Sequence, residues 1–254
     1  MPDIAISSGD PALDAFLSGP YQNIRGMSSR FAAAICGHVM RRQMALGIRG
    51  DFMEIGTFEG RFFLAMAKLL APGEHALGMD LFTWPSPNVY ERLRANCAGA
   101  GLDPKSYTAW KVDTRTLKAA DLRARLPAGN ARFIHVDGEH EDECLRHDLE
   151  LSHAALHPDG IIAIDDMLHP GYPMVMSAVL EYFARHPEMR LLCVVDREDI
   201  VAAPKFLICR GEARALYEQD LLSAFSRFHF TLNADMETYF ALVLTPRPRL
   251  AEVD

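Results

Sequence analysis

Short apolar runs alternate along the chain with longer segments in which apolar residues recur every three to four positions. The first pattern predicts buried strands and the second predicts amphipathic helices. Strands are expected at 51–55, 75–80, 107–112, 131–137, 161–165, 190–195 and 205–209. Helices are expected at 28–46, 61–70, 89–100, 117–126, 142–156 and 174–185, and most of them end at a Gly or Pro.

Strands that alternate with helices of this length are typical of a mostly parallel sheet with helices on both faces. The expected fold is α/β, a doubly wound Rossmann-like sheet of seven strands with an extra N-terminal helix and an irregular C-terminal extension. Residues 28–210 are expected to form the main domain. A poorly periodic lead-in or lid precedes it at 1–27, and an extension of the same domain follows at 211–254. That extension is expected to hold a helix at 213–225 and a further strand at 239–244.

Composition narrows the possible partners. The 254 residues include 26 basic and 34 acidic side chains, giving a formal net charge of −8. This balance disfavours a nucleic-acid partner, because a phosphate backbone selects a basic surface. No apolar run is long enough to span a bilayer, and the first residues lack the pattern of a secretory signal. The 5 cysteines are scattered and form no CxxC pair, which favours reduced thiols and a cytoplasmic protein.

The segment from Glu54 to Gly60 follows the first predicted strand, at the edge where such sheets bind ligands. Gly56 and Gly60 have the spacing G-x-x-x-G, which lets a ligand approach the backbone closely. This spacing matches neither the dinucleotide motif nor the phosphate-binding loop, so a nicotinamide oxidoreductase is the least favoured enzyme. A tight strand-to-helix turn with no ligand explains the short pattern equally well.

Two acids end the second and third predicted strands. Asp80 follows Gly56 at a spacing close to the roughly 20 residues expected for a carboxylate that binds ribose hydroxyls. Asp113 lies where a third strand can reach an adenine or its ribose. A loop acid at position 80, and a turn-capping acid at position 113, are the alternatives that involve no ligand.

Three more acids end the fourth and fifth predicted strands: Asp137, and the adjacent pair Asp165 and Asp166. Neighbouring parallel strands bring these side chains to one edge of the sheet. Clustered carboxylates raise one another's pKa unless a cation lies among them, and hard oxygen ligands favour Mg²⁺, Mn²⁺ or Ca²⁺ over zinc. Exposed loop-tip acids without a cation are the alternative.

Two histidines are candidate general bases near this edge. His140 follows Asp137, and His169 lies on the loop after Asp166. Histidine can take up a proton near neutral pH, as base catalysis requires. Chance placement remains an alternative, because the chain contains 10 histidines.

Together these motifs resemble the class I S-adenosylmethionine-dependent methyltransferases over roughly residues 28–210. The stretch HVDGEHEDECLRHDLELSHAALHPDGIIAIDDM is similar to a branch of small-molecule O-methyltransferases that includes macrolide and aminocoumarin sugar methyltransferases. The resemblance implies S-adenosyl-L-methionine as cofactor, bound by Glu54, Gly56, Thr57, Gly60, Asp80, Leu81, Asp113, Thr114 and Asp137. Within that set it implies that Asp80 binds the ribose and Asp113 the adenine amino group.

The same resemblance implies Mg²⁺ bound by Asp137, Asp165 and Asp166, with Asp137 and His140 as catalytic residues and His140 as the base. The expected reaction is methyl transfer to a hydroxyl of a small molecule, such as a sugar or polyhydroxylated natural product. A metal-independent N- or C-methyltransferase and a non-catalytic cofactor-binding protein are the alternatives. The expected partner is the small-molecule acceptor, with no nucleic acid and no membrane, and a homodimer remains open.

Overall fold

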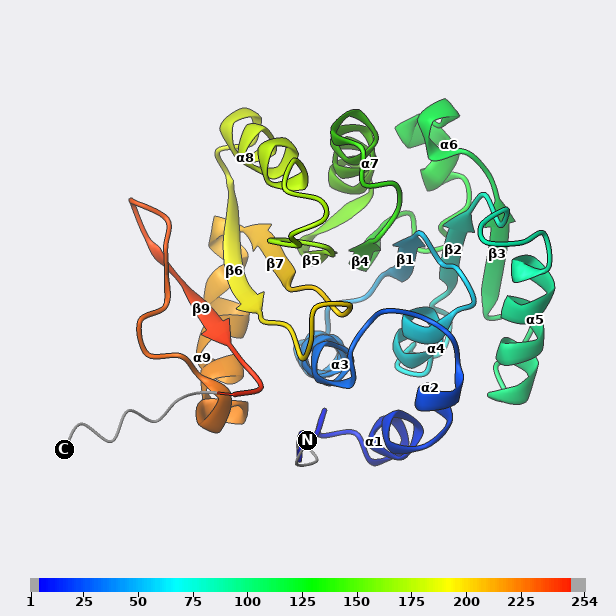
Figure 1. Cartoon of the computed structure of the whole chain (residues 1–254), viewed down its shortest axis with the longest axis horizontal. Helices are drawn as coiled ribbons and strands as arrows, with labels where there is room; N and C mark the ends of the chain where they lie inside the picture. Colours follow the sequence, from blue (N-terminus) through cyan, green and yellow to red (C-terminus); the bar gives the residue numbers. More distant parts are fainter. Residues whose placement is uncertain (1–4, 248–254) are drawn as a thin grey trace.

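A single mixed sheet forms the centre of the protein in a computed structural model that describes residues 5–247 (Figure 1). Nine strands pair in the order β3-β2-β1-β4-β5-β7-β6-β9-β8. They are β1 (Asp51–Ile55), β2 (Ala76–Asp80), β3 (Tyr107–Lys111), β4 (Ala131–Val136), β5 (Leu156–Ile164), β6 (Met189–Val195), β7 (Lys205–Arg210), β8 (Ala234–Asp235) and β9 (Phe240–Leu244).

Helices cover both faces of this sheet (Figure 1). One face carries α6 (Ala119–Arg123), α7 (Asp142–Ala155) and α8 (Val175–Arg185). The other carries α3 (Arg30–Ala45), α4 (Arg61–Ala67) and α9 (Arg214–Ala224), with α1 (Pro11–Ser18) and α2 (Pro20–Asn23) beyond them and α5 (Val89–Gly99) near β3. Short 3-10 turns lie at Thr114–Thr116, Gly211–Ala213 and Ser226–Phe228. Among the described residues, no helix has both the length and the apolar character needed to cross a membrane.

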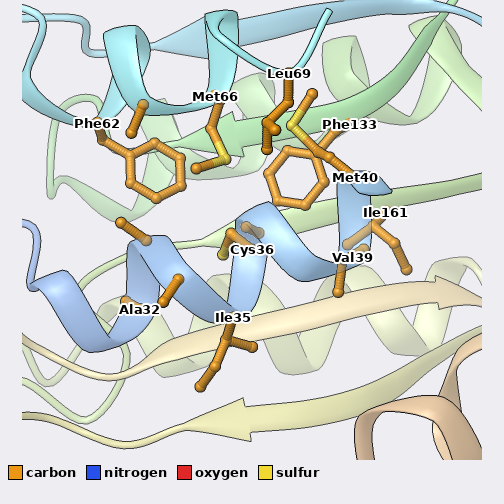
Figure 2. Packing of buried hydrophobic residues seen from close by; sticks show 14 of the residues in the cluster. Ala32, Ile35, Cys36, Val39, Met40, Phe62, Met66, Leu69, Phe133 and Ile161 are labelled. Atoms are coloured by element: carbon orange, nitrogen blue, oxygen red, sulfur yellow. The ribbon is translucent and has the colours of Figure 1, made fainter. Parts of the chain in front are cut away.

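The helix α3 shows how the sequence forms the core. Ser29 caps its first turn, with the Ser29 hydroxyl accepting the Ala32 N–H at 3.0 Å. Apolar side chains on the buried face of α3 then meet α4 and the sheet. Figure 2 shows Cys36 and Met40 of α3 beside Met66 of α4 and Phe133 of β4, all fully buried. This packing fixes the helix against the sheet and so fixes the positions of the strand ends.

Strand direction decides which residues meet at the functional edge. β1 pairs in parallel with β2 and β4, and β4 pairs in parallel with β5, so the carboxyl ends of these strands share one edge. β7 is antiparallel to both β5 and β6. The first residue of β7, Lys205, therefore lies at the edge that the other strands reach with their last residues.

The predicted α/β class is confirmed, and three details differ from prediction. The sheet has nine strands, because β9 pairs with β6 and the two-residue β8 extends it further. Residues 11–23 form α1 and α2, where a poorly periodic lead-in was expected; Asp10 caps α1, but the helix is too short to show a clear period. β5 begins at Leu156, within the predicted end of the preceding helix. The predicted segments 1–27 and 211–254 extend outside the described residues at 1–4 and 248–254.

Candidate active site

The glycine turn after β1 packs tightly against the end of β4. Gly56 has a φ of +86°, and a Cβ atom there would lie 1.8 Å from the Asp137 carbonyl oxygen. Gly60 has a φ of +87°, and a Cβ there would lie 2.4 Å from Leu93. Both glycines are therefore needed for the fold itself. The turn lies at the edge where the resemblance places the cofactor.

Asp80 joins the loops that follow β1 and β2. One carboxylate oxygen accepts the Phe58 N–H at 2.8 Å, and the other accepts the Phe82 N–H at 2.6 Å. Each oxygen has a second lone pair, so the carboxylate can still accept hydrogen bonds from two hydroxyl groups. Leu81, the next residue, is 47% exposed. The position fits a ribose-binding acid that also holds its own loop.

Asp113 and Thr114 already have partners within the chain. Arg115 donates to the Asp113 carboxylate from Nε at 2.9 Å and from its terminal nitrogen at 2.6 Å, and these hydrogen bonds lower the pKa of Asp113. The Thr114 side chain hydrogen-bonds Asp148 on α7. Turn capping therefore accounts for Asp113, and a contact with adenine would use its remaining lone pairs.

A buried chain of polar groups crosses from β1 to β7. Glu54 Oε1 lies 2.8 Å from His135 Nδ1, and His135 Nε2 lies 3.0 Å from Lys205 Nζ. Lys205 Nζ also donates to Asp165. An ammonium can only donate, so His135 Nε2 is the acceptor and Nδ1–H is donated to Glu54. His135 is thus a neutral imidazole of defined tautomer.

Electrostatics differ between the acids of this edge. Burial, and then the nearby Asp165 charge, raise the pKa of Asp137 well above its usual value. Burial opposes ionisation of Asp165 too, but the Lys205 ammonium outweighs it and lowers the pKa of that carboxyl. Asp165 is therefore held as a charged carboxylate, whereas Asp137 binds its proton more tightly than an ordinary aspartate does.

His140 pairs with Asp166 at the same edge. His140 Nε2 lies 2.5 Å from Asp166 Oδ2, and the imidazole stacks on Tyr172 with ring centroids 3.9 Å apart. Burial lowers the pKa of His140, but the hydrogen bond and charge of Asp166 outweigh it, so the net shift is upward. His169 stacks on the same Tyr172 ring at 4.8 Å, and its Nδ1 accepts the Gly171 N–H at 2.9 Å.

The implied metal ligands do not converge on one point. Among the described residues, the ligand atoms of Asp137 and Asp165 group with His135, whereas those of Asp137 and Asp166 group with His140. Both Asp165 oxygens already accept hydrogen bonds, one from the Lys205 ammonium and the other from the Asp166 N–H at 2.9 Å, so an ion bound there would lie next to a buried positive charge. Ligands of Mg²⁺ lie about 2.0–2.1 Å from the ion and hence about 3 Å from one another. The 2.5 Å His140–Asp166 contact is a hydrogen bond, and the three acids do not fit Mg²⁺ as a set.

The residues of this edge fit S-adenosylmethionine better than they fit Mg²⁺. Within the described part of the chain, Glu54 Oε2 is buried and has no hydrogen-bond partner. A buried carboxylate oxygen without a donor costs free energy, which an arriving cationic or N–H group would recover. S-adenosylmethionine carries an ammonium group and a ribose diol. The unpartnered oxygen of Glu54 and the spare lone pairs of Asp80 suit such a molecule.

Comparison with known proteins identifies the central part of the chain. Residues 53–167 match the family model described as a methyltransferase domain, a span that holds β1 to β5 and all the acids discussed above. Over residues 53–167 the chain is therefore similar to a methyltransferase domain. This agrees with the resemblance to S-adenosylmethionine-dependent methyltransferases. No curated protein matches this chain.

Several solved structures share the fold of this chain at low sequence identity. The O-methyltransferase TomG from Streptomyces achromogenes, involved in tomaymycin synthesis and solved with S-adenosylmethionine, has a TM-score of 0.54 and 15% identity, covering 81% of this chain and 92% of its own. The O-methyltransferase from Bacillus cereus, solved with S-adenosylhomocysteine, has a TM-score of 0.55 and 16% identity, with coverages of 79% and 91%. CalS11, a TDP-rhamnose 3'-O-methyltransferase of calicheamicin biosynthesis, has a TM-score of 0.54 and 20% identity, with coverages of 78% and 86%.

The sequence reasoning missed three polar residues of the candidate site. His135 stands within an apolar strand, and Lys205 directly precedes the apolar run of β7. Asp148 lies on the buried face of α7, where burial raises its pKa to about 6. Each is a single polar residue at a buried position of a predicted element, which is the signal that would have found it.

Proposed function

We propose that this protein transfers a methyl group from S-adenosylmethionine to a hydroxyl of a small molecule, such as a sugar or another polyhydroxylated compound. The observation that carries this proposal is the His140–Asp166 hydrogen bond of 2.5 Å at the carboxyl edge of the sheet, beside Asp137. A histidine held by a carboxylate is suited to removing a hydroxyl proton. The sugar O-methyltransferase among the structures of this fold supports the acceptor class.

His140 acts as the general base in this proposal. Nε2–H is donated to Asp166, so the lone pair lies on Nδ1, and Nδ1 takes the proton of the acceptor hydroxyl. The Asp166 carboxylate then stabilises the imidazolium that forms. Tyr172, stacked on the imidazole, holds the plane of the ring.

The bound cofactor supplies an activated methyl group that the acceptor oxygen attacks. Its proposed binding residues are those that the sequence implies: Glu54, Gly56, Thr57, Gly60, Asp80, Leu81, Asp113, Thr114 and Asp137. The raised pKa of Asp137 makes its protonated form, which can donate a hydrogen bond, easier to reach than for an ordinary aspartate. Alignment of the two reactants supplies much of the rate. Because Asp137, Asp165 and Asp166 do not fit Mg²⁺ as a set, the proposal contains no metal step.

The test compares His140→Ala with His169→Ala. Both histidines stack on Tyr172, but of the two side chains only that of His140 hydrogen-bonds the Asp166 carboxylate, so His169→Ala is a matched control. With labelled S-adenosylmethionine and a panel of sugar and phenolic hydroxyl acceptors, we expect His140→Ala to lower kcat by about 10²–10⁴-fold. His169→Ala should leave kcat within a few fold of the original.

Binding is measured separately by the rise in Tm with S-adenosylhomocysteine, which both variants should retain. Full activity of His140→Ala would show that another group is the base. Cofactor binding with no methylation of hydroxyl, amine or carbon acceptors would instead identify a non-catalytic binding protein. Transfer to amines or carbon alone would exclude the hydroxyl proposal.

A further inference from the structure

Lys205 is placed at the acidic edge by the reversal of β7. Val195, the last residue of β6, pairs with Lys205, and Ile164, the last residue of β5, pairs with Phe206. Lys205 therefore lies beside Asp165, the residue that follows β5. Its backbone pairs with β6, and the next residue, Phe206, pairs with β5, so the ammonium is held by the sheet and not by a loop.

The surroundings of Lys205 are closed to solvent. The residue is 1% exposed, and its side chain lies under the Phe62 ring with Nζ 5.1 Å from the ring centroid. Nζ donates to Asp165 and to His135 Nε2. A buried ammonium is stable only with such partners, because burying a charge without them costs several kcal/mol.

A divalent ion at Asp165 would have to displace this arrangement. It would need an Asp165 oxygen that now receives either the ammonium or the Asp166 N–H. It would also bring a double positive charge next to a buried single one, at a place where charges are poorly screened. The two cations therefore exclude one another at this carboxylate.

We propose that the Lys205 ammonium is the built-in cation of this edge and occupies, at Asp165, the place that a divalent metal would need. The inference rests on the proposed function, because it concerns the same strand edge. Lys205 is a positioning residue: it holds Asp165 charged and, through His135, holds Glu54 in place next to the glycine turn. The enzyme then works without an added divalent ion.

The first test uses the unmodified protein. We expect metal analysis after purification to find far less than one divalent ion per chain. EDTA, Mg²⁺ and Mn²⁺ should leave the Tm unchanged, both alone and with S-adenosylhomocysteine. One bound divalent ion per chain, or a rise in Tm with Mg²⁺ that Asp165→Asn abolishes, would overturn the proposal.

The second test removes the ammonium. Lys205→Met leaves Asp165 without a cation, so Mg²⁺ should now raise the Tm, and Lys205→Met with Asp165→Asn should lose that response. Lys105→Met, at an exposed lysine, is the matched control and should behave as the original. A folded Lys205→Met protein that ignores Mg²⁺ would contradict the proposal.

If Lys205→Met fails to fold, the measurements on the unmodified protein still decide the question. The Tm response to S-adenosylhomocysteine, measured in EDTA, separates this inference from the proposed function. If S-adenosylhomocysteine does not raise the Tm of the unmodified protein and Mg²⁺ has no effect either, the result counts against the proposed function alone. If S-adenosylhomocysteine raises the Tm and Mg²⁺ also raises it, the result counts against the role of Lys205 alone.

Discussion

Asp165 and Asp166 are neighbours in sequence, yet their surroundings are opposite. Asp165 turns into the sheet edge, where Lys205 and the Asp166 N–H occupy its oxygens. Asp166 has a φ of +56°, and its carboxylate instead meets His140, whose side chain is 30% exposed. One acid is closed off by a fixed cation, and the other holds a group that can still exchange a proton. Of these two adjacent carboxylates, Asp165 therefore has a structural role and Asp166 a chemical one.

The largest expected effect is a loss of stability when the buried carboxylate of Asp165 loses its partner. Lys205→Met leaves Asp165 charged and buried, so the free energy of unfolding should fall by about 3–5 kcal/mol. Urea unfolding followed by circular dichroism measures this loss. Adding Asp165→Asn should restore much of the stability, because the uncompensated charge is removed. A single Lys205→Met variant as stable as the original would show that the pair is not the buried ion pair described here.

Asp148 sharpens the comparison, because it is a buried acid with neither a lysine nor an arginine among the groups that shift its pKa. Burial raises its pKa to about 6 from 3.8, so the folded state holds the proton more tightly than the unfolded chain does. Its contribution to stability is therefore present at low pH and is lost as pH rises from about 4 to about 6. Asp148→Asn should remove that decline and stabilise the protein at pH 7, by up to about 3 kcal/mol. Unfolding free energies measured at pH 4.5 and pH 7 in both proteins check this; equal pH slopes would contradict it.

The smallest expected effect is a change in the pH profile of activity when Asp166, the partner of His140, loses its charge. Asp166→Asn keeps the shape of the side chain but removes the charge that raises the pKa of His140. The base must be neutral to act, so the acid limb of the kcat/KM profile should move to lower pH. We expect the plateau to fall by at most about 10²-fold, because the imidazole is held less firmly. An acid limb that does not move would mean that His140 is not the group being titrated.

The periodicity of the sequence predicted most of the sheet, because its strands are short apolar runs bounded by Gly, Pro or acids. α1 was missed because its 8 residues offer only three buried side chains, Leu13, Phe16 and Leu17, too few for a clear period. β5 was predicted to start too late because Pro158 and Gly160 indicate a turn. Both lie in the first part of that strand, before its apolar run at 161–164.

The candidate site was predicted as far as one rule extends, namely that parallel strands deliver their last residues to one edge. That rule correctly predicted which acids lie at this edge of the sheet: Glu54, Asp80, Asp137, Asp165 and Asp166. It could not place Lys205, because strand direction is a property of pairing and leaves no mark on the local sequence. It also treated Asp165 and Asp166 as equivalent, since their different directions arise from the left-handed backbone at Asp166. The cytoplasmic location stays a prediction, and the question of a homodimer stays open.

The reversed strand β7 also has a consequence for redesign. When a residue on a loop is replaced, the loop backbone can change shape, and the position of the new side chain then changes with it. Position 205 instead belongs to a strand paired on both sides, so its backbone should hold still when its side chain changes. The charge at this buried edge is thereby adjustable by a substitution at position 205, without any change to a loop.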